Sequence, residues 1–428
     1  MPSDAEIIRL WAHRGVTLLK NHIDEINSLN VFPVPDGDTG TNLYLTFESA
    51  YHFELKRHGQ ATDVVDALSA LAEGAMQGAR GNSGIILAEA LRGSFEAVQK
   101  ENYSLQTLLK AAATRARSAV DDPQPGTILS VLDAISEIPT PEITRVANRA
   151  REVLVETQGL LPQLQKAGVV DAGGRGLVVL LDALAQVCTG IDAESPSVGY
   201  VPEHVPSVEC KADKTFEIVF KMKYAEKTEI EQAIGRLGTS LSITSDGKVS
   251  VVHIHSDFPS VVLSEIGLMA SIWDVSIEKL EAAQGQLGCV CITEGTGNVM
   301  NLVTLGVIAL DRQAKVVTSD DLFGAVLKSN HNEVLLICAE RDVPTVMTVQ
   351  DRLRDFDKTV HPVQSDSVVS TLAGASVFHA ELSVNENLEL IQSVIANMRV
   401  ITLRNLEADL KALETVSDTE LVTVVWGQ

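Results

Sequence analysis

The segment from residue 30 to residue 42 has the residue types and spacing best suited to chemistry. It reads Asn-Val-Phe-Pro-Val-Pro-Asp-Gly-Asp-Thr-Gly-Thr-Asn. Asp36 and Asp38 are separated by one glycine, so in an extended loop both carboxylates can converge on one cation. Oxygen ligands of this kind suit Mg²⁺, which keeps its other positions for water and substrate phosphates. A Pro-Asp-Gly turn with an aspartate as helix cap is the structural alternative.

Four polar segments each lead into a predicted helix. After the acidic segment come Gly-Ala-Arg-Gly-Asn-Ser-Gly at 78–84, Gly-Thr-Ile-Leu at 126–129 and Asp-Ala-Gly-Gly-Arg-Gly at 171–176. Helix N-termini attract anions, and glycines let a backbone approach a phosphate closely. In a bundle, alternate loops meet at one end, so the segments can form one phosphate-binding rim. Tight connections between helices are the structural alternative.

The candidate residues follow from these segments. Asp36 and Asp38 are the predicted catalytic and metal-binding residues. The predicted nucleotide-binding residues are Thr39, Thr41, Asn42, Gly81, Asn82, Ser83, Gly84, Thr127 and Asp171. The chain has no G-x-x-x-x-G-K-[ST] segment, and no G-x-G-x-x-G follows a predicted strand, which disfavours P-loop and dinucleotide-binding folds.

Hydrophobic periodicity predicts how these segments are positioned. Residues 1–190 show stripes near the 3.6-residue period, which predict an all-α bundle of about eight helices. The expected helices lie at about 8–29, 42–57, 63–79, 83–100, 104–120, 127–138, 141–166 and 174–188. Three prolines in a polar stretch predict a linker at 191–212.

Beyond the linker the pattern changes to strands and helices. Residues 213–284 predict a β-α-β-β-α-β order, typical of a ferredoxin-like α+β domain. Residues 285–428 alternate apolar runs with helical stretches, which predicts an α/β domain with a parallel sheet, a long helix at about 384–398 and a last strand near 421–426.

Composition excludes several classes of protein. The 428 residues include 34 basic and 57 acidic side chains, a net charge of −23. Such a chain is poorly suited to non-specific nucleic-acid binding or to an anionic membrane surface. Five scattered cysteines, no secretory signal and no run of 18 apolar residues predict a cytoplasmic protein without a membrane span.

The four helix-start segments resemble those of the ATP-binding subunit of fatty acid kinase. The N-terminal domain of that family is similar to the L subunit of dihydroxyacetone kinase, and the resemblance covers about residues 1–190. It implies an α-helical barrel that holds ATP and two Mg²⁺ ions, with Asp36 and Asp38 as metal ligands. Dihydroxyacetone kinases have a third aspartate near the position of Asn30, so a metal bond from Asn30 stays open. The resemblance places Asn42, Asn82, Ser83 and Thr127 at the nucleotide.

Resemblance in the middle domain is looser. The family has a His-x-His strand that can bind a metal together with a cysteine. Here His253 and His255 match the histidines, while Glu217 stands at the cysteine position. Histidines at i and i+2 share one face of a strand, so they could form a second metal site. Two histidines on a polar sheet face are an equally good interpretation. Residues 285–428 resemble a shortened partner-binding region.

The resemblance implies a kinase subunit that uses ATP to phosphorylate the carboxylate of a fatty acid held by a separate fatty-acid-binding protein, giving an acyl phosphate, and the phosphate-type segments are consistent with that reaction. A carboxylate is ionised at neutral pH and needs no general base, only alignment and charge neutralisation. A kinase for a small substrate such as dihydroxyacetone, and a non-catalytic ATP-binding regulatory module, are the alternatives. A homodimer is left open.

Overall fold

A computed structural model describes residues 3–57, 63–100, 102–139, 141–191, 215–280, 286–312, 317–329 and 331–398. The linker predicted at 191–212, apart from its first residue, and the strand predicted near 421–426 lie outside these ranges. The chain divides into two compact units, residues 1–282 and 283–428, and each is described by itself.

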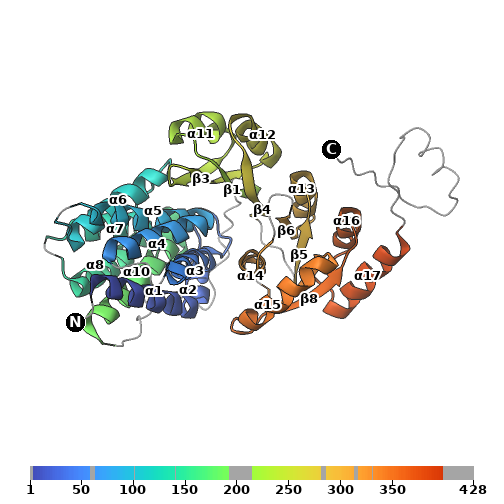
Figure 1. Ribbon diagram of the computed structural model, residues 1–428, viewed down its shortest axis with the longest axis horizontal. Helices are drawn as coiled ribbons and strands as arrows, with labels where there is room; N and C mark the ends of the chain where they lie inside the picture. Colours follow the sequence, from blue (N-terminus) through green and yellow to red (C-terminus); the bar gives the residue numbers. More distant parts are fainter. Residues whose placement is uncertain are drawn as a thin grey trace. The chain divides into compact units, whose positions relative to one another are not determined.

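The first unit begins with an all-α part, as the sequence predicts (Figure 1). Its described helices are α1 (Asp4–Asn21), α2 (Ile23–Ser28), α3 (Thr39–Arg57), α4 (Val64–Gln77), α5 (Gly81–Val98), α6 (Leu105–Ala119), α7 (Ile128–Ser136), α8 (Ile143–Thr157), α9 (Pro162–Ala167) and α10 (Ala172–Thr189).

Ten helices are present in this described part, where the sequence predicts about eight, because two expected helices are each divided. The expected helix at 8–29 divides at His22 into α1 and α2. The one at 141–166 divides into α8 and α9, and Pro162 is the first residue of α9. Proline has no N–H group, so it is tolerated in the first turn of a helix and breaks the interior of one.

Helix α10 is the one described helix long and apolar enough to cross a membrane by length and composition. In the structure, 67% of its 18 residues are buried, and it packs against α1, α3, α7 and α8. Helix α10 is therefore buried as a central helix of a bundle is.

The first unit continues with a four-stranded antiparallel sheet. Its elements are β1 (Phe216–Lys223), α11 (Lys227–Ile234), a 3-10 turn (Gly235–Leu237), β2 (Thr239–Ser245), β3 (Val249–Ser256), α12 (Pro259–Met269) and β4 (Ile272–Lys279). The strand order is β2-β3-β1-β4, and all neighbours are antiparallel. The order confirms the predicted ferredoxin-like arrangement.

One face of this sheet packs on the helical part. Val219 of β1 and Val251 of β3 form a buried cluster with Met76 of α4. Because side chains alternate along a strand, Glu217 of β1 points to the same face as Val219, and His253 and His255 point to the same face as Val251. The sheet therefore turns these three polar residues toward the helices.

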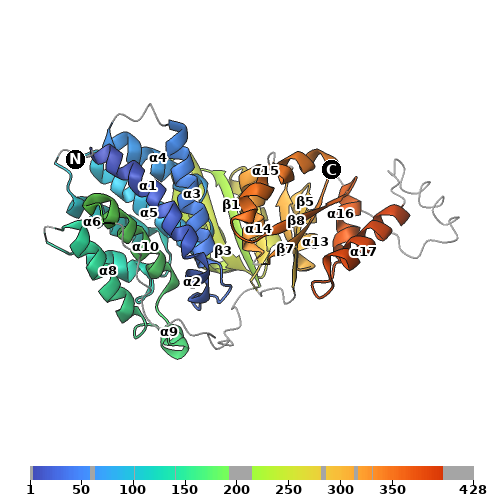
Figure 2. The ribbon, with the colours of Figure 1, turned by 90° about the horizontal axis from the view of Figure 1, so that it is seen from below.

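The second unit has a four-stranded parallel sheet, again as predicted. Its elements are β5 (Leu287–Thr293), α13 (Thr296–Thr304), β6 (Ile308–Asp311), α14 (Ser319–Lys328), β7 (Glu333–Cys338), a 3-10 turn (Glu340–Asp342), α15 (Val343–Arg354), β8 (Thr359–Gln364), α16 (Val368–Ser376) and α17 (Val384–Asn397). The strand order is β6-β5-β7-β8. Helices α14 and α15 pack together on one face, and α16 packs with α13 and α17 on the other (Figure 2).

Candidate active site

The loop between α2 and α3, residues 29–38, is called the acidic loop. Its two carboxylates are held by amide side chains on either side. Asn30 Nδ2 donates to Asp36 Oδ1 at 2.9 Å and to the Val34 carbonyl oxygen at 2.6 Å. Asn42 Nδ2 donates to Asp38 Oδ2 at 2.6 Å. Asn30 thus orients Asp36 through a hydrogen bond, a role that the sequence left open.

Helix α2 fixes the start of α3. Asn27 Oδ1 accepts the backbone N–H groups of Gly40 at 2.7 Å and Thr41 at 3.2 Å. Asn27 Nδ2 also donates to Thr41 Oγ1, and Thr41 does not line the pocket. These N–H groups, which the sequence suggested for an anion, are therefore occupied by Asn27.

A buried ion pair ties α2 to the end of the bundle where α10 begins. Arg175 of α10 is fully buried, and its Nε lies 2.7 Å from Glu25 Oε1 on α2. Its second contact joins Nη2 to Glu25 Oε2 at 3.1 Å. A bidentate pair of this kind sets orientation as well as distance. It holds α2, and with it the acidic loop, against α10.

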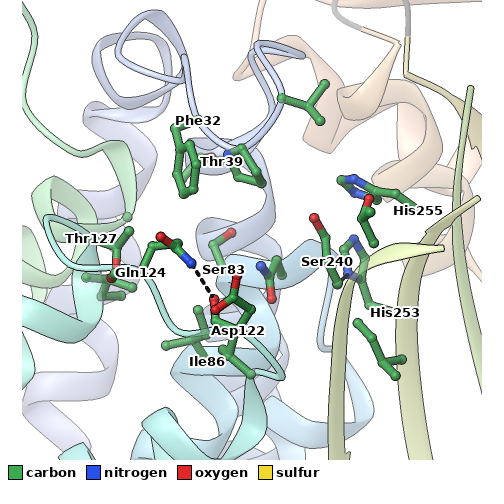
Figure 3. A pocket seen from close by; sticks show the side chains of 18 of the residues that line it. Phe32, Thr39, Ser83, Ile86, Asp122, Gln124, Thr127, Ser240, His253 and His255 are labelled. Atoms are coloured by element: carbon green, nitrogen blue, oxygen red, sulfur yellow. Dashed lines mark hydrogen bonds between the residues drawn. The ribbon is translucent and has the colours of Figure 1, made fainter. Parts of the chain in front are cut away.

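The acidic loop lies in a pocket of about 830 Å³, a size typical of small-molecule and cofactor sites. Figure 3 shows its two sides. The helical wall is lined by Asn30, Phe32, Asp36, Asp38, Thr39, Asn42, Asn82, Ser83, Ile86, Asp121, Asp122, Gln124, Thr127, Gln163 and Asp171 among others. The sheet wall is lined by Glu217, Thr239, Ser240, Leu241, His253 and His255.

The pocket has six carboxylates, and no lysine or arginine is among the described residues that line it. A polyphosphate cannot approach so many carboxylates unless cations offset their charge. Asn42 Oδ1 and Asn82 Oδ1 are buried and have no hydrogen-bond partner among the described residues, although buried polar atoms normally have one. The hard oxygen donors and these two acceptors fit magnesium and a nucleotide.

The second glycine-rich segment lies between the two walls. Gly81 has a φ of +55°, and a Cβ there would collide with Asn42 Nδ2 and lie 3.6 Å from Glu217 Oε1. Asn82 and Ser83 line the pocket, whereas Gly81 and Gly84 do not. A Cβ at Gly84 would collide with Thr46 Oγ1, so this glycine lets α5 pack closely on α3.

Helix α5 differs from the other helices that begin at the pocket. Asn27 caps α3, while the Asp171 carboxylate accepts N–H groups of Gly174 in α10, at 2.6 Å, and of Ile128 in α7. At α5, the side chain of the N-cap residue Arg80 makes no capping hydrogen bond among the described residues, while Thr46 Oγ1 accepts the N–H of Arg80 itself at 3.2 Å. The N-terminus of α5 is therefore the one best able to bind an anion.

Besides Thr41, three predicted nucleotide-binding residues use polar atoms within the protein. The Thr39 hydroxyl donates to Asn30 Oδ1. Thr127 Oγ1 donates to the Gln124 carbonyl oxygen at 3.0 Å. Asp171 is buried, and its burial raises the pKa of its carboxyl to about 6 although two backbone N–H groups oppose the rise. All three residues still line the pocket.

The sheet wall has a compact group of potential metal ligands. One donor atom from each of Glu217, His253 and His255 lies within 4.8 Å of the others. His253 Nε2 is 2.9 Å from Glu217 Oε1, and its Nδ1 is 3.0 Å from the Ser240 carbonyl oxygen. A carbonyl oxygen only accepts hydrogen bonds, so His253 Nδ1 is the donor to Ser240. The contact between His253 Nε2 and the Glu217 carboxylate then requires either a proton or a cation between them.

His255 is a neutral imidazole in this group. Burial, and next the neighbouring His253, lower the pKa of His255 to about 3. Two imidazoles and one carboxylate form a common donor set for zinc and similar ions. The sequence suggested this group as a separate second site, but the structure places it in the same pocket as Asp36 and Asp38.

Several lining residues were not predicted from the sequence. Asp121, Asp122 and Gln124 belong to the polar run Asp-Asp-Pro-Gln-Pro-Gly, which leads into α7 at Thr127. That run was a detectable signal. Ser240 carries no local signal, because it reaches the pocket only through the pairing of its strand.

Comparisons with known proteins agree with this two-part architecture. Residues 33–186 match the DAK2 domain, and residues 214–287 match the FakA-like middle domain of fatty acid kinase. Protein YloV of Bacillus subtilis is 26% identical over 460 residues, covering 94% of this chain and 82% of that protein. An uncharacterized Staphylococcus aureus protein, SAB1090, is 22% identical over 496 residues, covering 97% and 90%.

The dihydroxyacetone kinase of C. freundii was found among solved structures, in its native form and in complex with AMP-PNP and Mg²⁺. The complex has a TM-score of 0.34 and 18% identity, and the match spans 44% of this chain and 34% of that one. The domain matches confirm that the chain is a kinase-related subunit. It resembles the fatty acid kinase ATP-binding subunit and has an N-terminal domain like the dihydroxyacetone kinase L subunit.

Proposed function

We propose that this chain is the ATP-dependent subunit of a fatty acid kinase, which phosphorylates the carboxylate of a fatty acid presented by a separate lipid-binding protein. The observation that supports this most is the composition of the pocket. Paired carboxylates of the acidic loop lie together with the start of α5, where the N-cap side chain makes no capping hydrogen bond, and no lysine or arginine is among the described lining residues.

Asp36 and Asp38 would hold Mg²⁺, each kept in place by an amide neighbour. The metal, when bound, neutralises charge on the transferred phosphate. The backbone N–H groups at the start of α5 and the Ser83 hydroxyl would donate to phosphate oxygens. The buried Asn42 Oδ1 and Asn82 Oδ1 would accept from groups of the bound nucleotide complex or coordinate the cation.

The acceptor would enter between the two walls. A fatty acid carboxylate is already ionised, so no base is required, and the described helical wall contains no histidine or lysine. His253 and His255 lie across the pocket from Phe32 of the acidic loop (Figure 3), and Glu217 lines the same pocket. Neutral His255 can donate one N–H hydrogen bond to the incoming carboxylate and so orient it. Unlike a carboxylate side chain, it does not repel that group.

The acyl chain would remain on the partner protein. The lining of the pocket includes few large apolar side chains, chiefly Phe32, Ile86, Ile128, Leu129 and Leu241. These cannot enclose a long hydrocarbon chain and a nucleotide together. The second unit, residues 283–428, is proposed as the docking region for that partner.

The decisive experiment measures acyl phosphate formation with purified chain, Mg-ATP, candidate fatty-acid-binding proteins and fatty acid. Product is expected only when all components are present. Transfer to dihydroxyacetone without a lipid-binding protein would instead support the small-molecule kinase, which the DAK2 match keeps as the second candidate. ATP binding without transfer to either acceptor would support a regulatory module.

A further inference from the structure

Strand β2 is an edge strand of the antiparallel sheet, and it is the part of the sheet that meets helices α5 and α6. Edge strands expose unpaired backbone groups that can bind another segment. Here Val120, just after α6, forms an antiparallel bridge with Ser242, and the Asp121 N–H donates to the Leu241 carbonyl oxygen at 3.3 Å. The helical part thus continues the sheet for a short distance.

A buried polar group lies beside this bridge. Glu89 of α5 is 3% exposed, and its carboxylate accepts a hydrogen bond from Thr244 Oγ1 of β2. The other carboxylate oxygen lies 3.1 Å from Arg115 Nε of α6. Burial raises the pKa of Glu89, and the Arg115 charge opposes that rise most strongly. A buried carboxylate is costly unless it is paired, so this one is held by partners from both the sheet and the bundle.

The same elements carry the reacting groups. Helix α5 begins at Gly81 beside the pocket, and Glu89 follows about two turns later, roughly 12 Å along the helix. Strand β2 contributes Ser240, whose carbonyl oxygen accepts from His253. Residues 120–122 bridge the sheet edge and also line the pocket. A shift of β2 along α5 would therefore change the spacing between the two walls.

We propose that Glu89 and Thr244 are positioning residues, which hold the sheet wall at a fixed distance from the acidic loop. The contact between them, with Arg115 behind it and the Val120 bridge beside it, acts as a joint between the helical part and the sheet. Neither residue touches the pocket. The link to catalysis rests on the proposed function, whereas the existence of the joint does not.

The test uses the full chain with Thr244→Val, which removes the hydroxyl and keeps the shape, and Thr244→Ser, which keeps the hydroxyl. Hydrogen exchange measured by mass spectrometry is expected to be about tenfold faster at residues 120–122 and in β2 in Thr244→Val. In the same variant kcat for phosphoryl transfer should fall about tenfold with KM for ATP unchanged. Thr244→Ser should restore both.

Unchanged exchange in a folded Thr244→Val protein would overturn the joint itself. Faster exchange with unchanged kcat would overturn the positioning role. If the wild-type chain transfers phosphate to no acceptor, the proposed function fails and the exchange measurement still decides the joint. Lys227→Gln is a second variant in case Thr244→Val does not fold. Lys227 Nζ of α11 donates to the Ser118 carbonyl oxygen of α6, a neighbouring contact two residues before the Val120 bridge, and its loss should speed exchange at residues 120–122 less.

Discussion

The two walls of the pocket are built in different ways. The helical wall comes from loops that each lead into a helix, and its donors are oxygens of Asp36, Asp38 and neighbouring amides. The sheet wall comes from β1, β2 and β3, and within it Glu217 of β1 pairs with His255 of β3 and Val219 with His253. One wall suits hard cations and phosphates, while the other has two imidazoles and one carboxylate. This contrast fits the proposal that the helical wall binds the nucleotide and the sheet wall orients the acceptor.

The largest effect is expected from Asp38→Ala, which removes one ligand of the acidic loop. Acyl phosphate formation should fall by about a thousandfold or more, because Asp38 is one of the two acidic-loop carboxylates proposed to hold the metal against the phosphate. The loop connects α2 and α3, so thermal unfolding should change little. Asp351→Asn, an exposed carboxylate on α15, is the control and should keep full turnover. Normal turnover in Asp38→Ala would show that the acidic loop of the helical wall does not hold the catalytic metal.

His255→Asn tests the sheet wall and is expected to lower turnover by about a hundredfold. The nucleotide affinity, measured by calorimetry, should stay close to that of the wild type, because the phosphate donors lie on the helical wall. Equal losses of nucleotide affinity and turnover would contradict the division between the walls. His361→Asn, on β8 of the second unit, is a matched histidine control.

Ser83→Ala is expected to weaken Mg-ATP binding by about tenfold, since a hydrogen bond to a charged group contributes roughly 1.5–3 kcal/mol. Thr127→Ala should weaken binding less, because its hydroxyl already donates to the Gln124 carbonyl oxygen. Calorimetric titration of both variants, with Thr348→Val at an exposed position of α15 as control, measures the difference. A greater loss in Thr127→Ala would move the phosphate site from α5 to α7.

The smallest effect on turnover is expected from Asp171→Asn, which keeps a helix-capping side chain. The effect on stability depends on pH. The carboxyl has a pKa of about 6 when folded against 3.8 as reference, so the folded state binds the proton more tightly. This group therefore stabilises the fold below about pH 4, and the contribution of about 3 kcal/mol is lost as the pH rises to about 6.

Denaturant unfolding at several pH values between 4 and 7 measures this contribution. The fall in unfolding free energy over that range should be smaller in Asp171→Asn than in the wild type. Glu294→Gln, an exposed residue, is the control for general charge effects. If the unfolding free energies of Asp171→Asn and wild type change with pH in parallel, the Asp171 carboxyl keeps an ordinary pKa.

Much of the architecture could be predicted because it depends on local patterns. The 3.6-residue stripes predicted the helical part, and the β-α-β-β-α-β order predicted the antiparallel sheet. The number of helices was less accurate, since the breaks at His22 and before Pro162 interrupt stripes that continue in the sequence. Periodicity reports which faces are buried and does not report where a backbone turns.

The sequence by itself determined the local chemistry: Asp36 and Asp38 flank a glycine, and glycine-rich segments lead into helices whatever the rest of the chain does. It also determined that His253 and His255 share one face of a strand, because side chains alternate. Only the tertiary structure decided that Asn27 occupies the N–H groups at the start of α3 and that the Arg80 side chain leaves the first turn of α5 without a cap. It also decided that Glu217, His253 and His255 line the same pocket as the acidic loop. These outcomes depend on contacts between residues far apart in the chain, and hydrogen-bond partners at such separations are set by packing, which no local pattern encodes.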